Sequence, residues 1–163
     1  MTNETTQVAI IMGSDSDLPI VEAAFPILES FGIKFTKNVM SAHRTPHDVM
    51  ELIKNSEHNG CKVFIAAAGM AAHLAGAVAA HSTKPVIGIP IESGGMGGID
   101  PLLSTAMMPP GVPVATVAVG KSGAKNSAIL AVQILATSND DLARKLKDYK
   151  ENMRAEVLEL SLI

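Results

Sequence analysis

The chain is short of aromatic residues, cysteine and clustered charge, and each shortage excludes a class of protein. Aromatic side chains make up 3% of the 163 residues, tryptophan is absent, and the net charge is only −3. Nucleic-acid-binding proteins use clustered lysine and arginine and often stack bases on aromatic rings, so we expect no nucleic-acid partner. Cys61 is the single cysteine, which excludes an intrachain disulfide and a cysteine-ligated zinc site.

Long hydrophobic runs are also missing. No stretch reaches the ~18 consecutive apolar residues of a membrane-spanning helix. The first apolar run, Val8–Met12, is too short for a signal sequence, and residues 1–7 carry no basic segment. We therefore expect a cytoplasmic protein with no membrane contact. The chain does contain 47% hydrophobic residues, which indicates a densely packed globule.

Short apolar runs alternate along the chain with longer stretches of helical periodicity. The runs are continuously apolar, which is typical of parallel strands covered on both faces by helices. We predict strands at residues 8–12, 33–39, 63–67, within 85–90, and at 114–119. Periodicity and capping residues predict helices at residues 18–31, 45–60, 71–81, 100–107, 122–137 and 140–160. The sequence thus predicts one α/β domain over residues 1–163, with its core at about residues 7–137.

The last predicted helix, at about residues 140–160, forms an arm outside this alternation. One face of it is charged, and the other carries Leu142, Leu146, Tyr149, Met153, Val157 and Leu160. This apolar stripe can pack on the arm's own domain or on a neighbouring subunit. We slightly favour the neighbouring subunit, because other helices already cover the predicted sheet.

Two polar loops follow the first two predicted strands, at the edge where ligands bind in parallel α/β folds. The loop at residues 13–17 offers hydroxyl and helix-start N–H groups to an anionic oxygen, while one of its two carboxylates suits ribose hydroxyls better than phosphate. A helix cap rich in serine and aspartate explains the same residues equally well. In the second loop, Thr45 and Pro46 fix the start of a helix and leave His43 and Arg44 outside it. Arg44 can bind phosphate and His43 can exchange protons near neutral pH, although a plain surface loop is also compatible with them.

The loop after the third strand combines small residues with a histidine. Its run 68–72 leaves room for a flat ligand, and His73 serves either as a second polar contact or as a helix cap. The glycine-rich run 93–98 could close as a lid, but it does not match a dinucleotide-binding loop. His43 and His47 are four residues apart, yet they cannot share a helical face across Thr45 and Pro46, so we predict no metal site.

Together these motifs resemble a known enzyme family. The matching segments are Gly13-Ser14-x-Ser16-Asp17, Ser41-Ala42-His43-Arg44-Thr45-Pro46, Ala71-Ala72-His73-Leu74, and the run from Asn126 to Leu135. In this order and spacing they are similar to the PurE family, the N5-carboxyaminoimidazole ribonucleotide mutases of purine biosynthesis, over about residues 8–136. Arg44-Thr45 is similar to the bacterial mutase class, whereas the class that carboxylates aminoimidazole ribonucleotide directly with CO2 typically has Lys-Gly there. The chain departs from the family pattern at Met70 and Ala75, where glycine and proline are common, and at Pro110, where some members carry arginine.

The resemblance implies a three-layer flavodoxin-like domain with a parallel sheet, a homo-octamer, and a ribonucleotide substrate handled without cofactor or metal. It implies that His43 is the general acid and base and that Ser14, Asp17 and Arg44 bind the ribonucleotide. The full set of predicted substrate contacts is Ser14, Ser16, Asp17, Ser41, Ala42, Arg44, Gly69, Ala72, His73 and Leu74. The implied isomerisation converts N5-carboxyaminoimidazole ribonucleotide to 4-carboxy-5-aminoimidazole ribonucleotide by decarboxylation and recarboxylation. The freed CO2 must stay trapped between these steps, and the small apolar run 68–72 suits it.

Three other functions compete with this one. Direct carboxylation of aminoimidazole ribonucleotide uses the same kind of scaffold. A phosphoacceptor signalling domain needs an aspartate at the end of the third strand, where this chain has Ala68 and Gly69. A flavin carrier needs aromatic side chains around the ring, and these are scarce.

Overall fold

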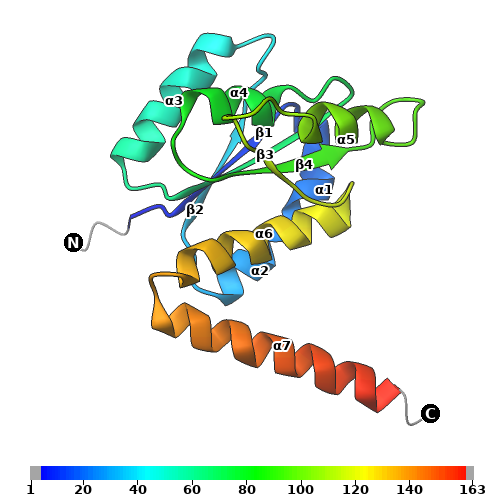
Figure 1. Cartoon of the computed structure of the whole chain (residues 1–163). Helices are drawn as coiled ribbons and strands as arrows, with labels where there is room; N and C mark the ends of the chain where they lie inside the picture. The colour runs from blue at the N-terminus through cyan, green and yellow to red at the C-terminus, as the bar shows by residue number, and fades with distance from the viewer. Residues whose placement is uncertain (1–4, 161–163) are drawn as a thin grey trace.

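Five parallel strands form the centre of the computed structural model, which describes residues 5–160. They are β1 (Val8–Met12), β2 (Phe35–Val39), β3 (Val63–Gly69), β4 (Val86–Ile91) and β5 (Ala115–Thr116). Their order across the sheet is β2-β1-β3-β4-β5, and every neighbouring pair is parallel (Figure 1). This is the flavodoxin-like order, so the predicted fold class is confirmed.

Burial explains which strands the sequence reveals most clearly. Every residue of β1 and β4 is buried, and so are the first five residues of β3. Alternate residues face opposite helical layers, so a central strand must be apolar at every position. β2 lies at the edge of the sheet, reads Phe-Thr-Lys-Asn-Val and is partly exposed, so it departs from the continuous apolar pattern.

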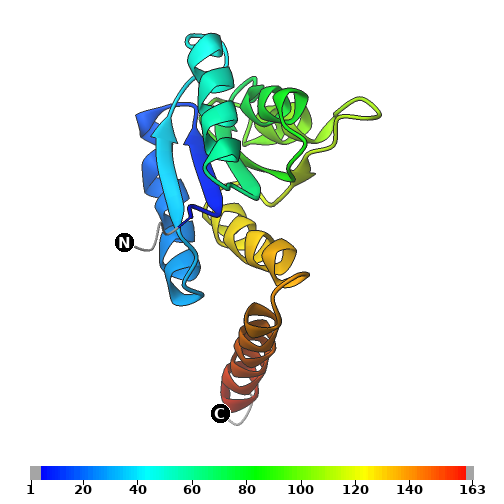
Figure 2. The ribbon, with the colours of Figure 1, turned by 90° about the vertical axis from the view of Figure 1, so that its left-hand side faces the viewer.

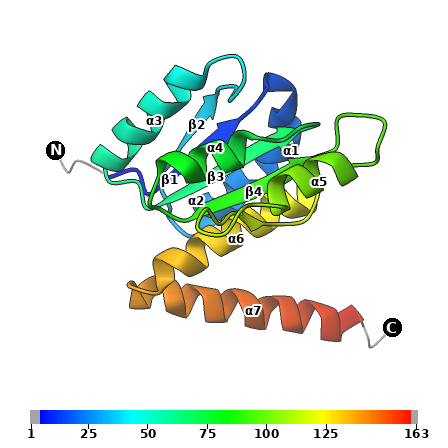
Figure 3. The same cartoon turned by 45° about the horizontal axis from the view of Figure 1, so that its top comes forward.

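Helices cover both faces of the sheet, as Figures 1 and 3 show. One layer contains α1 (Leu18–Val21), α2 (Phe25–Ser30) and α6 (Lys121–Ala136). The other contains α3 (Pro46–His58), α4 (Leu74–His81) and α5 (Ile99–Ala106). Two buried clusters result, one on each face of the sheet. Within residues 5–160, no helix combines the length and the apolar character that crossing a bilayer requires.

The helix predicted at residues 18–31 is interrupted in the structure. A 3-10 turn at Asp15–Asp17 precedes α1, and a second one at Glu22–Ala24 separates α1 from α2. Pro19 and Pro26 stand in the first turns of α1 and α2. Proline has no N–H to continue the hydrogen bonding of a preceding helical turn, so each proline starts a new segment. The apolar spacing alone did not reveal this break.

Several further elements are shorter than predicted, among them β2, which begins at Phe35 and not at residue 33. α4 begins at Leu74 because the N–H groups of Ala72 and His73 bond to carbonyls only two residues earlier. β5 contains two residues, although the chain continues beside β4 as far as Gly120. Pro90 in β4 accepts a hydrogen bond from Gly120 but has no N–H to donate in return, so the regular ladder stops.

α7 (Asp140–Leu160) has its predicted range and extends away from the sheet (Figure 2). Its first half packs on the chain's own domain, because Leu142 is buried and the Tyr149 ring meets the Phe31 ring with centroids 5.8 Å apart. In the second half the apolar side chains are exposed, from 40% at Met153 to 71% at Leu160. The own-domain alternative therefore holds for the first half, and packing of the second half on a neighbour stays a prediction.

Candidate active site

The loops that follow β1, β2 and β3 surround one pocket of about 580 Å³. β1 lies between β2 and β3, at the point where the strand order reverses and flavodoxin-like folds open a crevice. The pocket is lined by Gly13, Ser14, Ser16, Asp17, Ser41, Ala42, His43, Arg44, Ala68, Gly69, Met70, Ala71, His73, Leu74 and Ser93. The two polar loops and the small-residue loop singled out in the sequence thus meet at one site.

Hydrogen bonds within the loop after β1 hold its serines in place. The Ser14 Oγ accepts from the Ser16 N–H at 3.3 Å, and the Ser14 N–H donates to Asp17 Oδ2 at 3.0 Å. These bonds form a reciprocal capping box around the 3-10 turn. The cap explanation is therefore correct for this loop, and the capped loop also presents the hydroxyls of Ser14 and Ser16 to the pocket.

Asp17 is the most buried charged group of the pocket lining. Asp17 is only 4% exposed to solvent. Burial, which disfavours a charged carboxylate, raises the pKa of Asp17 above its ordinary value of 3.8. The N–H of Ser14 works in the opposite direction, and the neighbouring Asp15 carboxylate adds to the rise.

Ser41 and Thr45 fix the turn after β2. The Thr45 Oγ1 accepts from the Ser41 N–H and donates to the Ser41 carbonyl, both at 3.0 Å. The Ser41 Oγ in turn accepts from the Arg44 N–H at 3.2 Å. Thr45 occupies the predicted N-cap position before Pro46, but its hydroxyl bonds back to Ser41 and makes no cap bond into α3. As a result His43 and Arg44 project from a closed turn.

Arg44 joins this turn to the loop after β1. Its Nη2 donates to the carbonyl oxygen of Gly13 at 3.1 Å. The residue is exposed, so its remaining N–H groups can reach an anion in the pocket. The bond to Gly13 also fixes where the positive charge lies relative to the serine hydroxyls.

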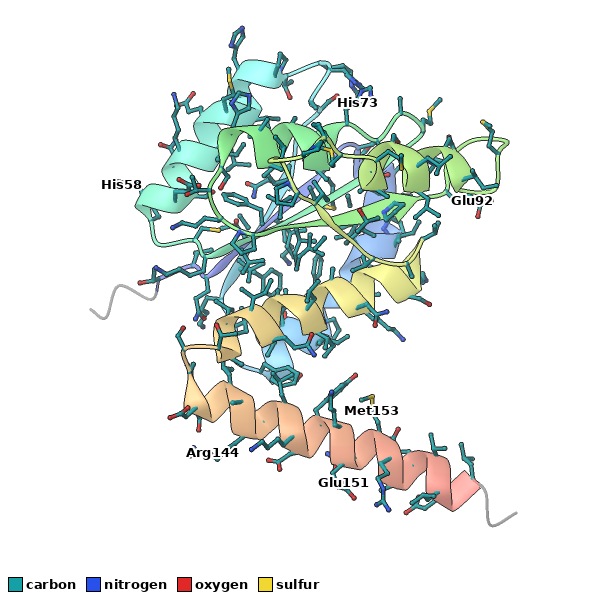
Figure 4. The ribbon with its side chains drawn as sticks, viewed as in Figure 1. His58, His73, Glu92, Arg144, Glu151 and Met153 are labelled. Carbon is teal, nitrogen blue, oxygen red and sulfur yellow. The ribbon has the colours of Figure 1, made fainter. Side chains whose placement is uncertain are left out.

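The two histidines of the pocket contact each other. The Nε2 of His43 lies 2.6 Å from the Nδ1 of His73, and the rings meet at 87° with centroids 4.8 Å apart. At this distance one nitrogen carries a proton and the other a lone pair, so the contact holds a single proton. His73 occupies the N-cap position of α4 but makes no side-chain cap bond, so the cap explanation is wrong and a contact with the ligand stays a prediction. Figure 4 shows His73 at the end of the molecule opposite α7.

The third wall of the pocket is a tight turn at residues 69–73. A Cβ on Gly69 would lie 1.8 Å from the Ser93 Oγ, so glycine permits the loop after β4 to approach here. Met70 has φ +54°, a left-handed conformation that glycine adopts freely. The glycine common at this position in the resembled family therefore fits the backbone better than the methionine of this chain.

Every predicted contact except Ala72 lines the pocket. Ala72 is 2% exposed, and its N–H donates to the Ser104 Oγ at 3.0 Å, behind the pocket wall. The lining residues that were not predicted as contacts are Gly13, Ala68, Met70, Ala71 and Ser93. Most of them belong to the predicted loops, whereas Ser93 depends on packing that leaves no local signal. Among residues 5–160, no group of three His, Cys, Asp or Glu side chains is placed to hold a metal ion.

Comparison with known proteins places this geometry in a family. The sequence matches the AIR carboxylase (AIRC) family over residues 7–156. It is 52% identical to the N5-carboxyaminoimidazole ribonucleotide mutase of Thermotoga maritima over 94% of this chain and 88% of the relative. The mutase of that name from Escherichia coli K12 is 45% identical over 96% of this chain and 93% of the relative. The crystal structure of Treponema denticola PurE superposes with a TM-score of 0.85 at 30% identity and covers 94% of each chain. The chain belongs to the AIR carboxylase family.

Proposed function

We propose that this protein is an isomerase of de novo purine biosynthesis that converts N5-carboxyaminoimidazole ribonucleotide to 4-carboxy-5-aminoimidazole ribonucleotide. The observation that carries the proposal is the convergence of His43 and the 13–17 loop on one pocket, with Arg44 bonded across the gap between them. Relatives at 45–52% identity bear the mutase name. A pocket of about 580 Å³ is of the size that takes a mononucleotide.

The charges of the lining support one orientation of the nucleotide. Arg44 brings a permanent positive charge beside the hydroxyls of Ser14 and Ser16, and this group suits the phosphate. The carboxyl group of Asp17 repels phosphate but accepts hydrogen bonds from ribose hydroxyls. The aminoimidazole ring then lies toward His43 and the 69–74 wall. The remaining predicted contacts, at Ser41, Ala42, Gly69, His73 and Leu74, follow from this placement, while Ala72 supports the wall from behind.

In the proposed reaction His43 first donates a proton to the substrate and later accepts one from it. The bond between the exocyclic nitrogen and the carboxyl carbon breaks, the electron pair stays on nitrogen, and nitrogen takes a proton from His43. The freed CO2 then bonds to C4, and the proton of C4 returns to His43. A positioned imidazole can serve as acid and then base near neutral pH, typically for a factor of 10²–10⁴ in rate. Substrate and product are isomers and the reaction has no net oxidation or reduction, so it needs no redox cofactor.

The small apolar wall beside His43 is the proposed holding place for CO2. Ala68, Gly69 and Ala71 line the pocket with little side-chain bulk, which suits a linear nonpolar molecule. CO2 that stays next to C4 reacts with it in one bound complex, which is faster than a reaction that depends on dilute CO2 diffusing in from solution. Substrate labelled with ¹³C at its carboxyl group tests this in unlabelled bicarbonate: the product keeps the label if CO2 stays bound and loses it if CO2 escapes.

The assay that tests the function supplies each substrate separately. We expect the purified protein to turn over N5-carboxyaminoimidazole ribonucleotide in buffer depleted of bicarbonate. Turnover only with aminoimidazole ribonucleotide plus bicarbonate would refute the mutase assignment. It would instead support the second candidate, direct carboxylation, which the description of the matched family as AIR carboxylase favours.

We further propose that the chain is a single cytoplasmic domain that assembles into a homo-octamer. The exposed apolar side chains of α7 beyond Tyr149 support contact with a neighbouring subunit. In Figure 4, Met153 points toward the side of α6, whereas Arg144 and Glu151 point away from it. Light scattering on the purified protein measures the subunit number directly, and a monomeric mass would refute the assembly.

A further inference from the structure

We propose that Ser104, which does not line the pocket, is a positioning residue whose hydroxyl fixes the 70–73 turn and with it one wall of the pocket. The inference rests on the proposed function, because it assigns the residue to the reacting end of the nucleotide site. Ser104 belongs to α5, which is remote in sequence from every loop of the pocket except that of Ser93.

The hydroxyl of Ser104 reaches the backbone of the turn. Its Oγ accepts from the Ala72 N–H at 3.0 Å and lies 3.3 Å from the carbonyl oxygen of Met70. It also lies 2.8 Å from the carbonyl oxygen of Asp100, one helical turn earlier. The carbonyl oxygen of Pro101 lies 3.4 Å away. A hydroxyl has one hydrogen to donate, so the donated bond goes to one of these three carbonyls, while the bond from Ala72 persists in each case.

The turn itself has weak internal bonding. The N–H of Ala72 bonds to the Met70 carbonyl at 2.9 Å, and the N–H of His73 bonds to the Ala71 carbonyl at 2.8 Å. Such bonds span only two residues, as in γ-turns, and close small, bent rings. Met70 is also in the left-handed region. A strained conformation of this kind is stable only when interactions with its surroundings fix it. The hydrogen bond between Ser104 and Ala72 is such an interaction from outside the turn.

The position of the turn sets the reacting end of the pocket. It carries Met70 and Ala71 in the lining and leads into His73, whose Nδ1 lies 2.6 Å from the Nε2 of His43. The phosphate end is held separately, by the bond from Arg44 to Gly13 and by the Ser14 capping box. A loosened turn should therefore impair chemistry more than nucleotide binding.

The test compares two serine-to-alanine variants. Ser104→Ala removes the bond to Ala72. Ser30→Ala is the matched control, because the Ser30 Oγ donates to the Ile27 carbonyl at 2.7 Å in α2 and makes no hydrogen bond to another segment within residues 5–160. We expect kcat to fall on the order of 10-fold in Ser104→Ala and to stay unchanged in Ser30→Ala, since small misplacements at a reacting centre cost this much or more. The Kd for aminoimidazole ribonucleotide without bicarbonate should change less than about twofold in both.

Two further measurements separate positioning from general damage. Ser104→Thr keeps the hydroxyl and should restore most of kcat. Imidazole ¹⁵N NMR of the nucleotide-free protein should show altered His43 and His73 signals in Ser104→Ala but not in Ser30→Ala. Should Ser104→Ala fail to fold, Ser104→Cys replaces it in the same comparison, because a thiol is a much weaker acceptor of similar shape.

The outcomes distinguish this inference from the proposed function. Wild-type protein that does not act on N5-carboxyaminoimidazole ribonucleotide overturns the function, and the histidine signals still decide whether Ser104 positions the turn. Unchanged kcat together with unchanged histidine signals in Ser104→Ala overturns the inference. Equal losses in kcat and nucleotide affinity, without rescue by threonine, also overturn it.

Discussion

The Nε2 atom of His43 lies 2.6 Å from the Nδ1 atom of His73, so the proposed acid and base is hydrogen-bonded before any substrate arrives. The two rings come from different loops, one after β2 and one after β3, and both line the pocket. The contact holds one proton and fixes the plane of the His43 ring.

Replacing His43 by asparagine should remove most turnover and spare binding. Asparagine keeps a polar side chain but cannot exchange protons near neutral pH, so we expect kcat to fall by a factor of about 10² or more. Calorimetric titration with aminoimidazole ribonucleotide should give a Kd within a few-fold of wild type. His47→Asn is the control, because His47 lies on α3 and does not line the pocket. Near-normal turnover by His43→Asn would contradict the role proposed for His43.

Replacing Arg44 by alanine should weaken the binding of the nucleotide. Charge-assisted hydrogen bonds contribute about 1.5–3 kcal/mol, which corresponds to roughly 10- to 100-fold in Kd. Arg44→Lys should recover part of the loss, since lysine keeps the charge but not the forked geometry. Arg144→Ala, on the exposed surface of α7, controls for loss of a positive charge. An unchanged Kd in Arg44→Ala would show that the phosphate binds elsewhere.

Replacing Asp17 by asparagine should change how stability depends on pH. The folded-state pKa of Asp17 is raised above 3.8, mainly by burial, so the folded protein binds this proton more tightly than the unfolded chain does. The stabilisation from this group is complete below pH 3.8 and is lost as pH rises through the folded-state pKa. The asparagine side chain is neutral throughout this range, and its carbonyl oxygen can still accept the Ser14 N–H.

The free energy of unfolding, measured in urea at several pH values, tests this directly. Relative to wild type, Asp17→Asn should gain stability as pH rises from about 4 toward 7. Asp148→Asn on exposed α7 controls for the loss of one carboxylate. A stability difference that stays constant over this range would contradict the raised pKa.

The convergence of the three loops on one site could be predicted, because parallel topology places the ends of neighbouring strands at one edge of the sheet. The sequence predicts parallel strands at residues 8–12, 33–39 and 63–67. The segments that follow such strands lie at one edge of one sheet. His43, Arg44 and Ser14 were placed in this way without any tertiary information. The strand pattern does not predict that Ser93 and Ser104 lie near this site. Their positions depend on how the loop after β4 and α5 pack against the turn at residues 69–73.

Local sequence also failed where backbone geometry overrides side-chain type. Periodicity predicted one helix across residues 18–31, yet the missing N–H of Pro26 divides it. Methionine gives no sign of a left-handed residue, and the departure from the family's glycine at position 70 did not lead to a prediction of one. His73 was equally undecided, since nothing near it in sequence fixes whether its ring caps α4 or faces His43.

The strain at Met70 leads to a prediction about stability that separates backbone from side chain. Met70 is 61% exposed and has φ +54°. Met70→Ala and Met70→Gly both remove the thioether side chain, and the two variants differ from each other only by the Cβ. A residue with a Cβ in the left-handed region is disfavoured by roughly 1–2 kcal/mol. Glycine avoids this conformational cost in the folded protein. It also makes the unfolded chain more flexible, which lowers the free energy of unfolding by about 0.5–1 kcal/mol.

The balance favours glycine, so Met70→Gly should be more stable than Met70→Ala by about 0.5–1 kcal/mol, measured as the free energy of unfolding in urea. Gly95→Ala provides a contrast, because a Cβ there has open space around it and the residue lacks a positive φ. If Ser104 holds the strained turn, the advantage of Met70→Gly over Met70→Ala should be smaller in a Ser104→Ala background, because the turn has lost its outside bond and can relax out of the left-handed conformation. Equal stability of the two position-70 variants in both backgrounds would mean that the turn at residues 70–73 is not strained.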